Sequence, residues 1–320
     1  MGAILEVNLL SPITLAFALG IVARLIRSDF SLPRDIYAGL GIYLLFALGL
    51  KGGVELSKAP WGAIMLPALV TLALGCIRPL TSYFVLRKIG RMNVSDSAGI
   101  AAHYGSVSAV TFIAALTFVE GMGSPAEGFL PTLLALLESP GIAIALTIGA
   151  LGVGSTRATS EVVHEVLTGR TMVLLVGGLL VGYFSAPEAW AQVAPFFDGG
   201  IFKGALVLFL LEMGVVAGER LNDLRKTGAF LLAFGVLMAL AHGVLGAFLG
   251  TVAGLSPGGA TVLAAMSASA SYIAAPPAVR ITLPEANPTL SLTAALAITF
   301  PFNIIIGIPI YYQLALWFAR

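Results

Sequence analysis

The sequence has few of the residues on which enzyme chemistry usually depends. Among 320 residues there are one Cys and three His. A single cysteine excludes an internal disulfide, a CxxC redox pair and a cysteine metal cluster, and scattered histidines give no transition-metal ligand spacing. The GxxxxGK[ST] and HExxH patterns are also missing. We therefore predict that the protein is not an enzyme, binds no organic cofactor and has no transition-metal site.

Charge is equally scarce. Only 10% of the residues are charged and the formal net charge is +1, so no dense basic face exists to neutralise the phosphates of a nucleic acid. In contrast, 58% of the residues are hydrophobic and the mean hydropathy is +0.98. This composition is typical of a chain embedded in lipid, and it leaves no room for a soluble catalytic domain.

The apolar residues gather in long runs. A helix that crosses a bilayer needs about 20 of them, and the sequence divides into about ten such stretches. Hydrophobicity on all sides over runs of this length favours helices over barrel strands. We therefore predict an all-α polytopic membrane protein with ten transmembrane helices. The predicted spans are 10–26, 36–50, 60–86, 97–119, 129–152, 171–187, 200–217, 228–253, 258–282 and 289–316.

The positive charges predict an orientation. With ten crossings, four of the 17 Lys and Arg fall on the side of the termini, and the other thirteen lie at or near the opposite connections. The positive-inside rule places those connections in the cytoplasm. Both termini then lie on the non-cytoplasmic side of a bacterial plasma (inner) membrane. The longest cytoplasmic connection, 154–170, is predicted to join two halves, 1–153 and 171–320. The four residues on the terminal side are Lys51, Lys58, Lys203 and Arg320.

Two pairs of segments indicate an internal repeat. The run Leu45–Gly53 aligns with Leu210–Gly218 at an offset of 165 in both its apolar and its glycine positions, and two serine stretches align at an offset of 163. We interpret the halves as five-helix repeats. Because five is odd, the second copy enters the membrane from the opposite face, and such inverted repeats favour a carrier over a pore. The serine stretches are Gly105-Ser106-Val107-Ser108 and Ala268-Ser269-Ala270-Ser271.

The two serines of each stretch are two residues apart, which would place them on different faces of a regular helix. We therefore expect broken helices at spans four and nine. Pro276 and Pro277 support a break, because proline is tolerated in the first turn of a new half-helix. Hydroxyls beside the unpaired N–H groups of a half-helix suit a small oxyanion. The alternative is that the small residues only permit close helix packing.

Few ionisable side chains fall within the spans. A charged Glu138 would cost a few kcal/mol or more unless it were paired, coordinated or protonated, so it is the leading cation-site candidate. Alternatively it is a neutral acid that fixes a kink at Pro140. His103 and His242 are interpreted as packing residues rather than proton carriers, and His164 as a solvated loop residue.

The sequence resembles the sodium-dependent bicarbonate transporters first recognised in cyanobacteria, over nearly its whole length. The last of the matching blocks is long and irregular, which makes it the most specific. The blocks are Ser11–Phe17, Gly49–Gly53, Gly105–Leu116, Met213-Gly214 followed by Leu224–Lys226, and Pro276-Pro277 through Pro284–Pro288.

The resemblance implies sodium-coupled bicarbonate uptake by alternating access, in a homotrimer. It implies a gate domain made of spans one, two, six and seven and a core domain made of the others. One bicarbonate would lie between the serine stretches, held by Ser106, Ser108, Ser269 and Ser271 and by the amides of Val107 and Ala270. The nearest sodium candidates would be Thr111 and Glu138, with Ser108, Ser271 and Tyr272 beside them.

Two departures from the family pattern matter. Tyr272 stands where the cyanobacterial transporters are expected to carry an aspartate, so protons could replace sodium, or the anion could differ. The central connection is also shorter than theirs, which leaves control by a small cytoplasmic regulatory protein open. The alternatives are a carrier of another small anion, such as a carboxylate or sulfate, coupled to sodium or protons, and an anion channel.

Overall fold

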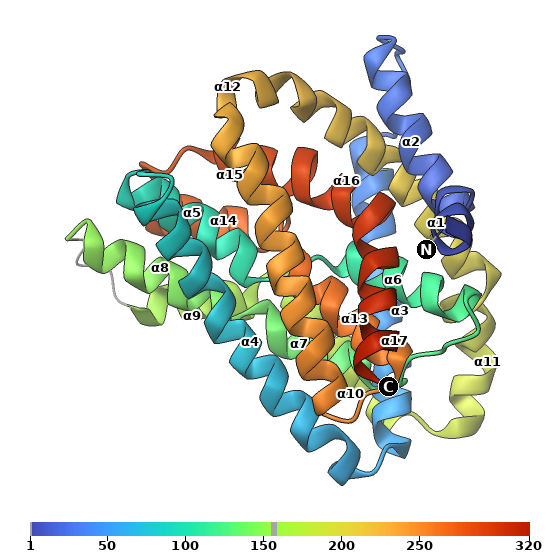
Figure 1. Cartoon of the computed structure of the whole chain (residues 1–320). Coiled ribbons are helices and arrows are strands. Elements are labelled where there is room, and N and C mark those ends of the chain that lie inside the picture. The colour runs from blue at the N-terminus through green and yellow to red at the C-terminus, as the bar shows by residue number, and fades with distance from the viewer. Residues whose placement is uncertain (1, 155–158) are drawn as a thin grey trace.

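The computed structural model describes residues 2–154 and 159–320, and in these ranges all regular structure is helical (Figure 1). The prediction of an all-α protein is confirmed. The predicted joint at 154–170 includes residues 155–158, among them Arg157, which lie outside the described residues. The rest of the joint contains the short helix α9 (Thr159–Thr168).

The helices of the first half are α1 (Gly2–Leu9), α2 (Pro12–Leu25), α3 (Arg34–Lys58), α4 (Trp61–Lys88), α5 (Val94–Gly105), α6 (Ala109–Gly121), α7 (Leu130–Glu138) and α8 (Pro140–Gly152). After α9 come α10 (Arg170–Phe184), α11 (Pro187–Phe197), α12 (Gly200–Val252), α13 (Pro257–Ala268) and α14 (Ala275–Thr282). The last stretch comprises α15 (Pro288–Thr293), a π-helix (Ala294–Thr299), α16 (Phe300–Phe302), a second π-helix (Asn303–Gly307) and α17 (Ile308–Phe318).

The helices have the length and surface of a membrane bundle. Among the described residues, seven helical stretches are long and apolar enough to cross a bilayer, and α2 and α10 are shorter apolar helices. Large apolar side chains such as Leu19, Leu69 and Phe184 are exposed on the outside of the bundle, where lipid would cover them. A multi-pass membrane protein is confirmed, while the count of ten crossings stays a prediction.

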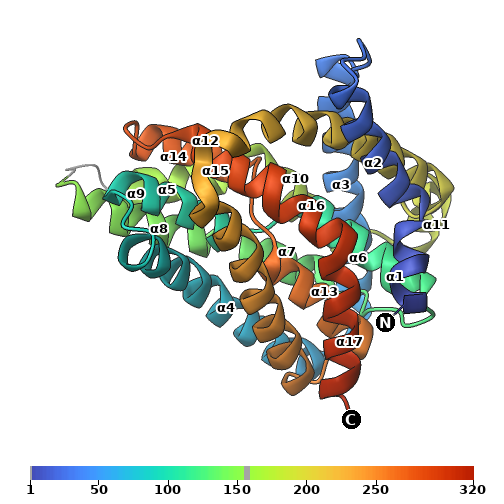
Figure 2. The same ribbon diagram turned by 45° about the horizontal axis from the view of Figure 1, so that its top comes forward.

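The connection predicted between spans seven and eight, 218–227, is helical instead. The chain is helical from Gly200 to Val252 apart from Gly228, where φ is 77°, a value that glycine adopts without steric cost. The two parts of α12 meet there in the bend that Figures 1 and 2 show. Ion pairs support the first part near its end, at 3.4 Å between Arg24 and Glu219 and at 3.6 Å between Arg220 and Asp223.

Two helix pairs pack backbone to backbone through glycine. A Cβ at Gly49 of α3 would lie 2.5 Å from the carbonyl oxygen of Leu175 in α10, and one at Gly214 of α12 would lie 2.1 Å from that of Phe17 in α2. Only glycine permits such close approach, which is how helices associate in lipid. Gly49 and Gly214 are aligned positions in the predicted repeat, and each packs on the backbone of a neighbouring helix.

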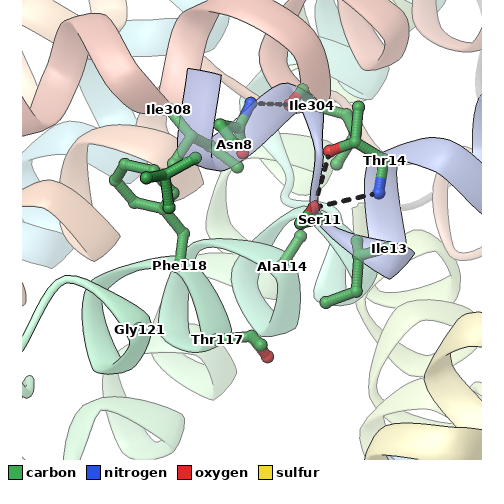
Figure 3. Close-up of a pocket in the computed structure, with 11 residues that line it drawn as sticks. Asn8, Ser11, Ile13, Thr14, Ala114, Thr117, Phe118, Gly121, Ile304 and Ile308 are labelled. Atoms are coloured by element: carbon green, nitrogen blue, oxygen red, sulfur yellow. Dashed lines mark hydrogen bonds between the residues drawn. The ribbon is translucent and has the colours of Figure 1, made fainter. Parts of the chain in front are cut away.

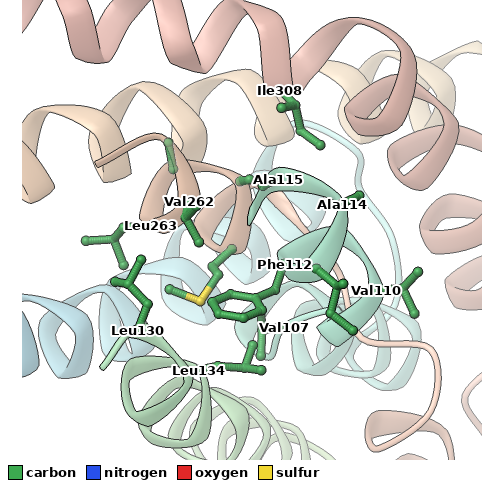
Figure 4. Close-up of a cluster of buried hydrophobic side chains, with 14 of the residues drawn as sticks. Val107, Val110, Phe112, Ala114, Ala115, Leu130, Leu134, Val262, Leu263 and Ile308 are labelled. Atoms are coloured by element: carbon green, nitrogen blue, oxygen red, sulfur yellow. The ribbon is translucent and has the colours of Figure 1, made fainter. Parts of the chain in front are cut away.

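A buried apolar cluster holds α6 against α7 and α13 (Figure 4). Phe112 of α6, Leu134 of α7 and Leu263 of α13 are fully buried in it. Since α6 follows one serine stretch and α13 precedes the other, this packing brings the two stretches together.

Candidate functional site

The first serine stretch is a break between two helices, as predicted. Helix α5 ends at Gly105 and α6 begins at Ala109. Ser106 lies in extended backbone and its N–H donates to Ala102 O, which closes the last turn of α5. Ser108 caps α6, because its Oγ accepts a hydrogen bond from the Thr111 N–H at 3.1 Å.

The second serine stretch repeats this arrangement. Helix α13 ends at Ala268 and α14 begins at Ala275. Ser269 is extended and closes α13, and Ser271 Oγ accepts from the N–H groups of Ala274 and Ala275 at 3.2 and 3.3 Å. Pro276 and Pro277 lie in the first turn of α14, as predicted for the start of a half-helix.

The two breaks contact each other directly. The Ser108 N–H donates to Ser269 Oγ at 2.9 Å, and the Ser271 N–H donates to His103 O at 2.8 Å. His103 Nδ1 also lies 2.6 Å from Ser271 O, so this histidine fixes the second break to the first, which agrees with a packing role. All four serines are buried. The segments therefore meet inside the bundle.

The four hydroxyls have different partners. Ser106 Oγ donates to Glu138 O at 2.8 Å and Ser269 Oγ donates to Met266 O at 2.7 Å, so both are used by the protein itself. Ser108 Oγ donates to the Tyr272 hydroxyl at 3.2 Å. In the described part of the chain, the Ser271 O–H has no acceptor, and the amides of Val107 and Ala270 have none either.

The two helix ends at the breaks make close contacts through their main chain. Gly105 packs on Gly141 of α8, where a Cβ would lie only 2.1 Å from Gly105 O. The carbonyl of Ala268 accepts a hydrogen bond from Asn303 Nδ2 at 3.1 Å. Gly105 and Ala268 are therefore placed to shape the site through the main chain.

Arg78 of α4 is a candidate site residue whose position the sequence did not predict. It was counted with the thirteen charges near the cytoplasmic connections, but its side chain is fully buried between the breaks. Its Nη2 donates to Ser106 O at 2.6 Å and to Ser269 O at 2.9 Å. The signal that could have found it is a charge inside the apolar run 60–86, because an intramembrane ionisable residue marks a functional site by default.

The cation candidates are only partly brought together. Glu138, the last residue of α7, is buried, and its Oε2 has no hydrogen-bond partner among the described residues. The chain turns into α8 at Pro140 directly after it. Glu138 lines a small cavity of about 10 Å³ with Ser108, Ser271 and Tyr272. Thr111 does not line this cavity, although its buried Oγ1 also lacks a partner in the described chain.

A larger pocket adjoins this cavity. It has a volume of about 370 Å³ and lies between α9, α10 and α14. The first turns of α10 and α14 face it, and Thr171 and Ile273 line both the pocket and the small cavity. The pocket therefore reaches the breaks from the side of the central connection, with Arg170 in its wall.

A second pocket, of about 210 Å³, lies between α1, α2, α6 and the last helical stretch (Figure 3). Asn8 donates to Ile304 O at 2.8 Å in its wall, and Ser11 lies 3.1 Å from the Thr14 hydroxyl. No residue of the two breaks lines it.

A bundle of apolar helices with two polar chain breaks closed on each other in its interior is typical of a secondary membrane carrier. The sequence model of the Na+-dependent bicarbonate transporter superfamily matches residues 12–316, so the chain belongs to that superfamily. No curated protein matches the chain. Membership confirms the resemblance seen in the sequence and makes the protein a membrane carrier, not an enzyme, of a family that transports bicarbonate in dependence on sodium.

Proposed function

We propose that the protein is a symporter that takes up bicarbonate with sodium by alternating access. The observation that carries this proposal is the direct contact of the two chain breaks, through the Ser108 amide on Ser269 and the Ser271 amide on His103. Broken helices that meet inside a bundle provide polar groups for a substrate where regular helices provide none.

The anion would lie beside the small cavity between the breaks. The Ser271 hydroxyl and the amides of Val107 and Ala270 are the donors without partners in the described structure. Ser108 and Tyr272 form one wall and can reorient their shared hydrogen bond toward a ligand. Neutral donors of this kind suit a small oxyanion such as bicarbonate, since they bind it without the bulk of an arginine.

The sodium ion would bind near Glu138. A buried carboxylate without a partner costs several kcal/mol in the membrane unless a cation offsets its charge. Ser108, Ser271 and Tyr272, which line the cavity with Glu138, would supply neutral oxygens. Thr111 lies outside this cavity and is a further candidate only. The cation would bind first and so allow the anion to enter, which couples the two fluxes.

Alternating access would come from two inverted five-helix repeats, 1–153 and 171–320, that together form ten spans. The equivalent roles of Gly49 and Gly214 support the repeat. We assign α2, α3, α10 and the first part of α12 to a gate domain and the remaining spans to a core domain. Both termini would lie on the non-cytoplasmic side of the plasma membrane, so the pocket beside α9 would open to the cytoplasm. We also propose that the protein is a homotrimer.

Uptake into proteoliposomes tests the function. We expect inward sodium to stimulate the uptake of labelled bicarbonate, with saturation and counterflow that exclude a channel. Glu138→Gln should abolish the sodium stimulation, whereas Glu188→Gln, which removes an exposed acid from α11, should leave it unchanged. No stimulation by sodium at any pH would refute the coupling, and better competition by sulfate or a carboxylate than by unlabelled bicarbonate would refute the substrate.

A further inference from the structure

A buried cation lies where the carbonyl ends of two half-helices meet. Arg78 is fully buried, and one nitrogen of its guanidinium bridges Ser106 O at the end of α5 and Ser269 O at the end of α13. We propose that Arg78 is a fixed cation of the transport site that holds these two carbonyl groups in place of a second coupling sodium ion. The proposal rests on the sodium-coupled uptake described above.

The chemistry of the carbonyl pair supports this assignment. The C-terminal ends of half-helices carry partial negative charge, and in secondary transporters such carbonyl groups coordinate sodium. Here the guanidinium occupies both oxygens, one from each half of the chain. It cannot dissociate into solution or be carried across the membrane, because it is covalently part of α4.

The charges around the breaks agree with a single mobile cation. Arg78 contributes one positive and Glu138 one negative charge, and no ion pair joins them among the described residues. His242 lies in the same region, where its Nε2 is 2.9 Å from the Thr81 hydroxyl, and His103 is bound to the second break. With both histidines neutral, the empty site has no net charge. One sodium ion then balances one bicarbonate.

The guanidinium is only partly hydrogen-bonded. Nε and Nη1 have no hydrogen-bond partner in the described structure. A neutral donor could join the two carbonyls at a smaller desolvation cost than a charged guanidinium. The charged guanidinium instead offsets the partial negative charge of the two carbonyl ends, as a bound sodium ion would.

The proposal is tested by the number of sodium ions that accompany one anion. In wild-type proteoliposomes we expect one sodium ion per bicarbonate and a sodium Hill coefficient of about 1. In Arg78→Gln the freed carbonyls should admit a second sodium ion, so the Hill coefficient should rise to about 2 and more sodium should be needed for half-maximal uptake. Arg78→Lys keeps the charge and should keep the wild-type coefficient. Arg24→Gln removes an exposed arginine of α2 and should also keep it.

A second measurement does not depend on transport. Sodium chloride, compared with choline chloride, should raise the melting temperature of detergent-purified Arg78→Gln more than that of the wild type, because an extra ligand site adds linked stability. If no bicarbonate is taken up but this difference is present, the substrate assignment fails and Arg78 retains its role. Two sodium ions per anion in the wild type would overturn the proposal. So would a folded Arg78→Gln protein with wild-type sodium dependence, or one that sodium neither stabilises nor activates.

Discussion

Substitution of Gly141 by alanine should disturb the first break without touching any proposed ligand group. Gly141 lies in the first turn of α8 beside Gly105, and a Cβ there would lie 2.1 Å from Gly105 O and 2.3 Å from its carbonyl carbon. Backbone atoms cannot rotate away as a side chain can, so α8 must move by about 1 Å, because Cβ atoms essentially never lie within 3.0 Å of another heavy atom. The end of α5, with the Ser106 carbonyl that Arg78 holds, would move with it.

The expected magnitude follows from two opposing terms. Overpacking in a filled interior costs about 1–3 kcal/mol, while replacement of a helical glycine by alanine returns about 0.5–1 kcal/mol. The difference is a net loss of up to about 2.5 kcal/mol. Because the clash is with backbone, we expect the upper half of that range, seen as a lower melting temperature of the detergent-purified protein, together with reduced bicarbonate uptake.

Gly39→Ala is the matched control. Gly39 is also a helical glycine, in α3, but a Cβ there would meet nothing within 4 Å, so this variant should be as stable as the wild type or slightly more stable. If Gly141→Ala melts and transports like Gly39→Ala, the close contact between α5 and α8 does not exist as described and the argument from backbone packing is refuted.

Two further predictions concern the anion donor Ser271 and the ion pair between Lys203 and Glu120. Ser271→Ala should raise the bicarbonate KM by about 2- to 10-fold, the value of one neutral hydrogen bond; an unchanged KM would remove this hydroxyl from the site. Lys203 of α12 lies 3.4 Å from Glu120 of α6, and both side chains are partly exposed. Lys203→Gln should change stability by less than about 1 kcal/mol. It should increase labelling, by an impermeant thiol reagent, of a cysteine placed at Thr117, because Thr117 lines one pocket with this pair; equal labelling would show that the ion pair does not limit access to position 117.

The chemistry of small polar residues made the breaks predictable from the sequence. Two serines at a spacing that a regular helix cannot place on one face, and prolines that fit only a first turn, indicated interruptions at 106–108 and near 269–274, and the chain is non-helical at both. Long apolar runs located the helices because each must cover the hydrocarbon core.

Other features depend on contacts between distant segments and could not be predicted. Arg78 was interpreted as one more positive charge near a connection, because nothing local shows that two carbonyls from separate halves converge on it. The helical connection at 218–227 was predicted as a loop because its residues are polar, whereas ion pairs to α2 and within α12 support a helix. The partners of each serine hydroxyl likewise depend on tertiary packing.

An experimental structure with saturating bicarbonate and sodium tests the central claim most directly. We predict density for one small anion beside Ser271, within hydrogen-bond distance of the Val107 and Ala270 amides, and the Arg78 guanidinium still on both carbonyls. Anion density elsewhere, such as in the pocket beside Thr14, with the two breaks in their present contact and no density between them, would contradict the account.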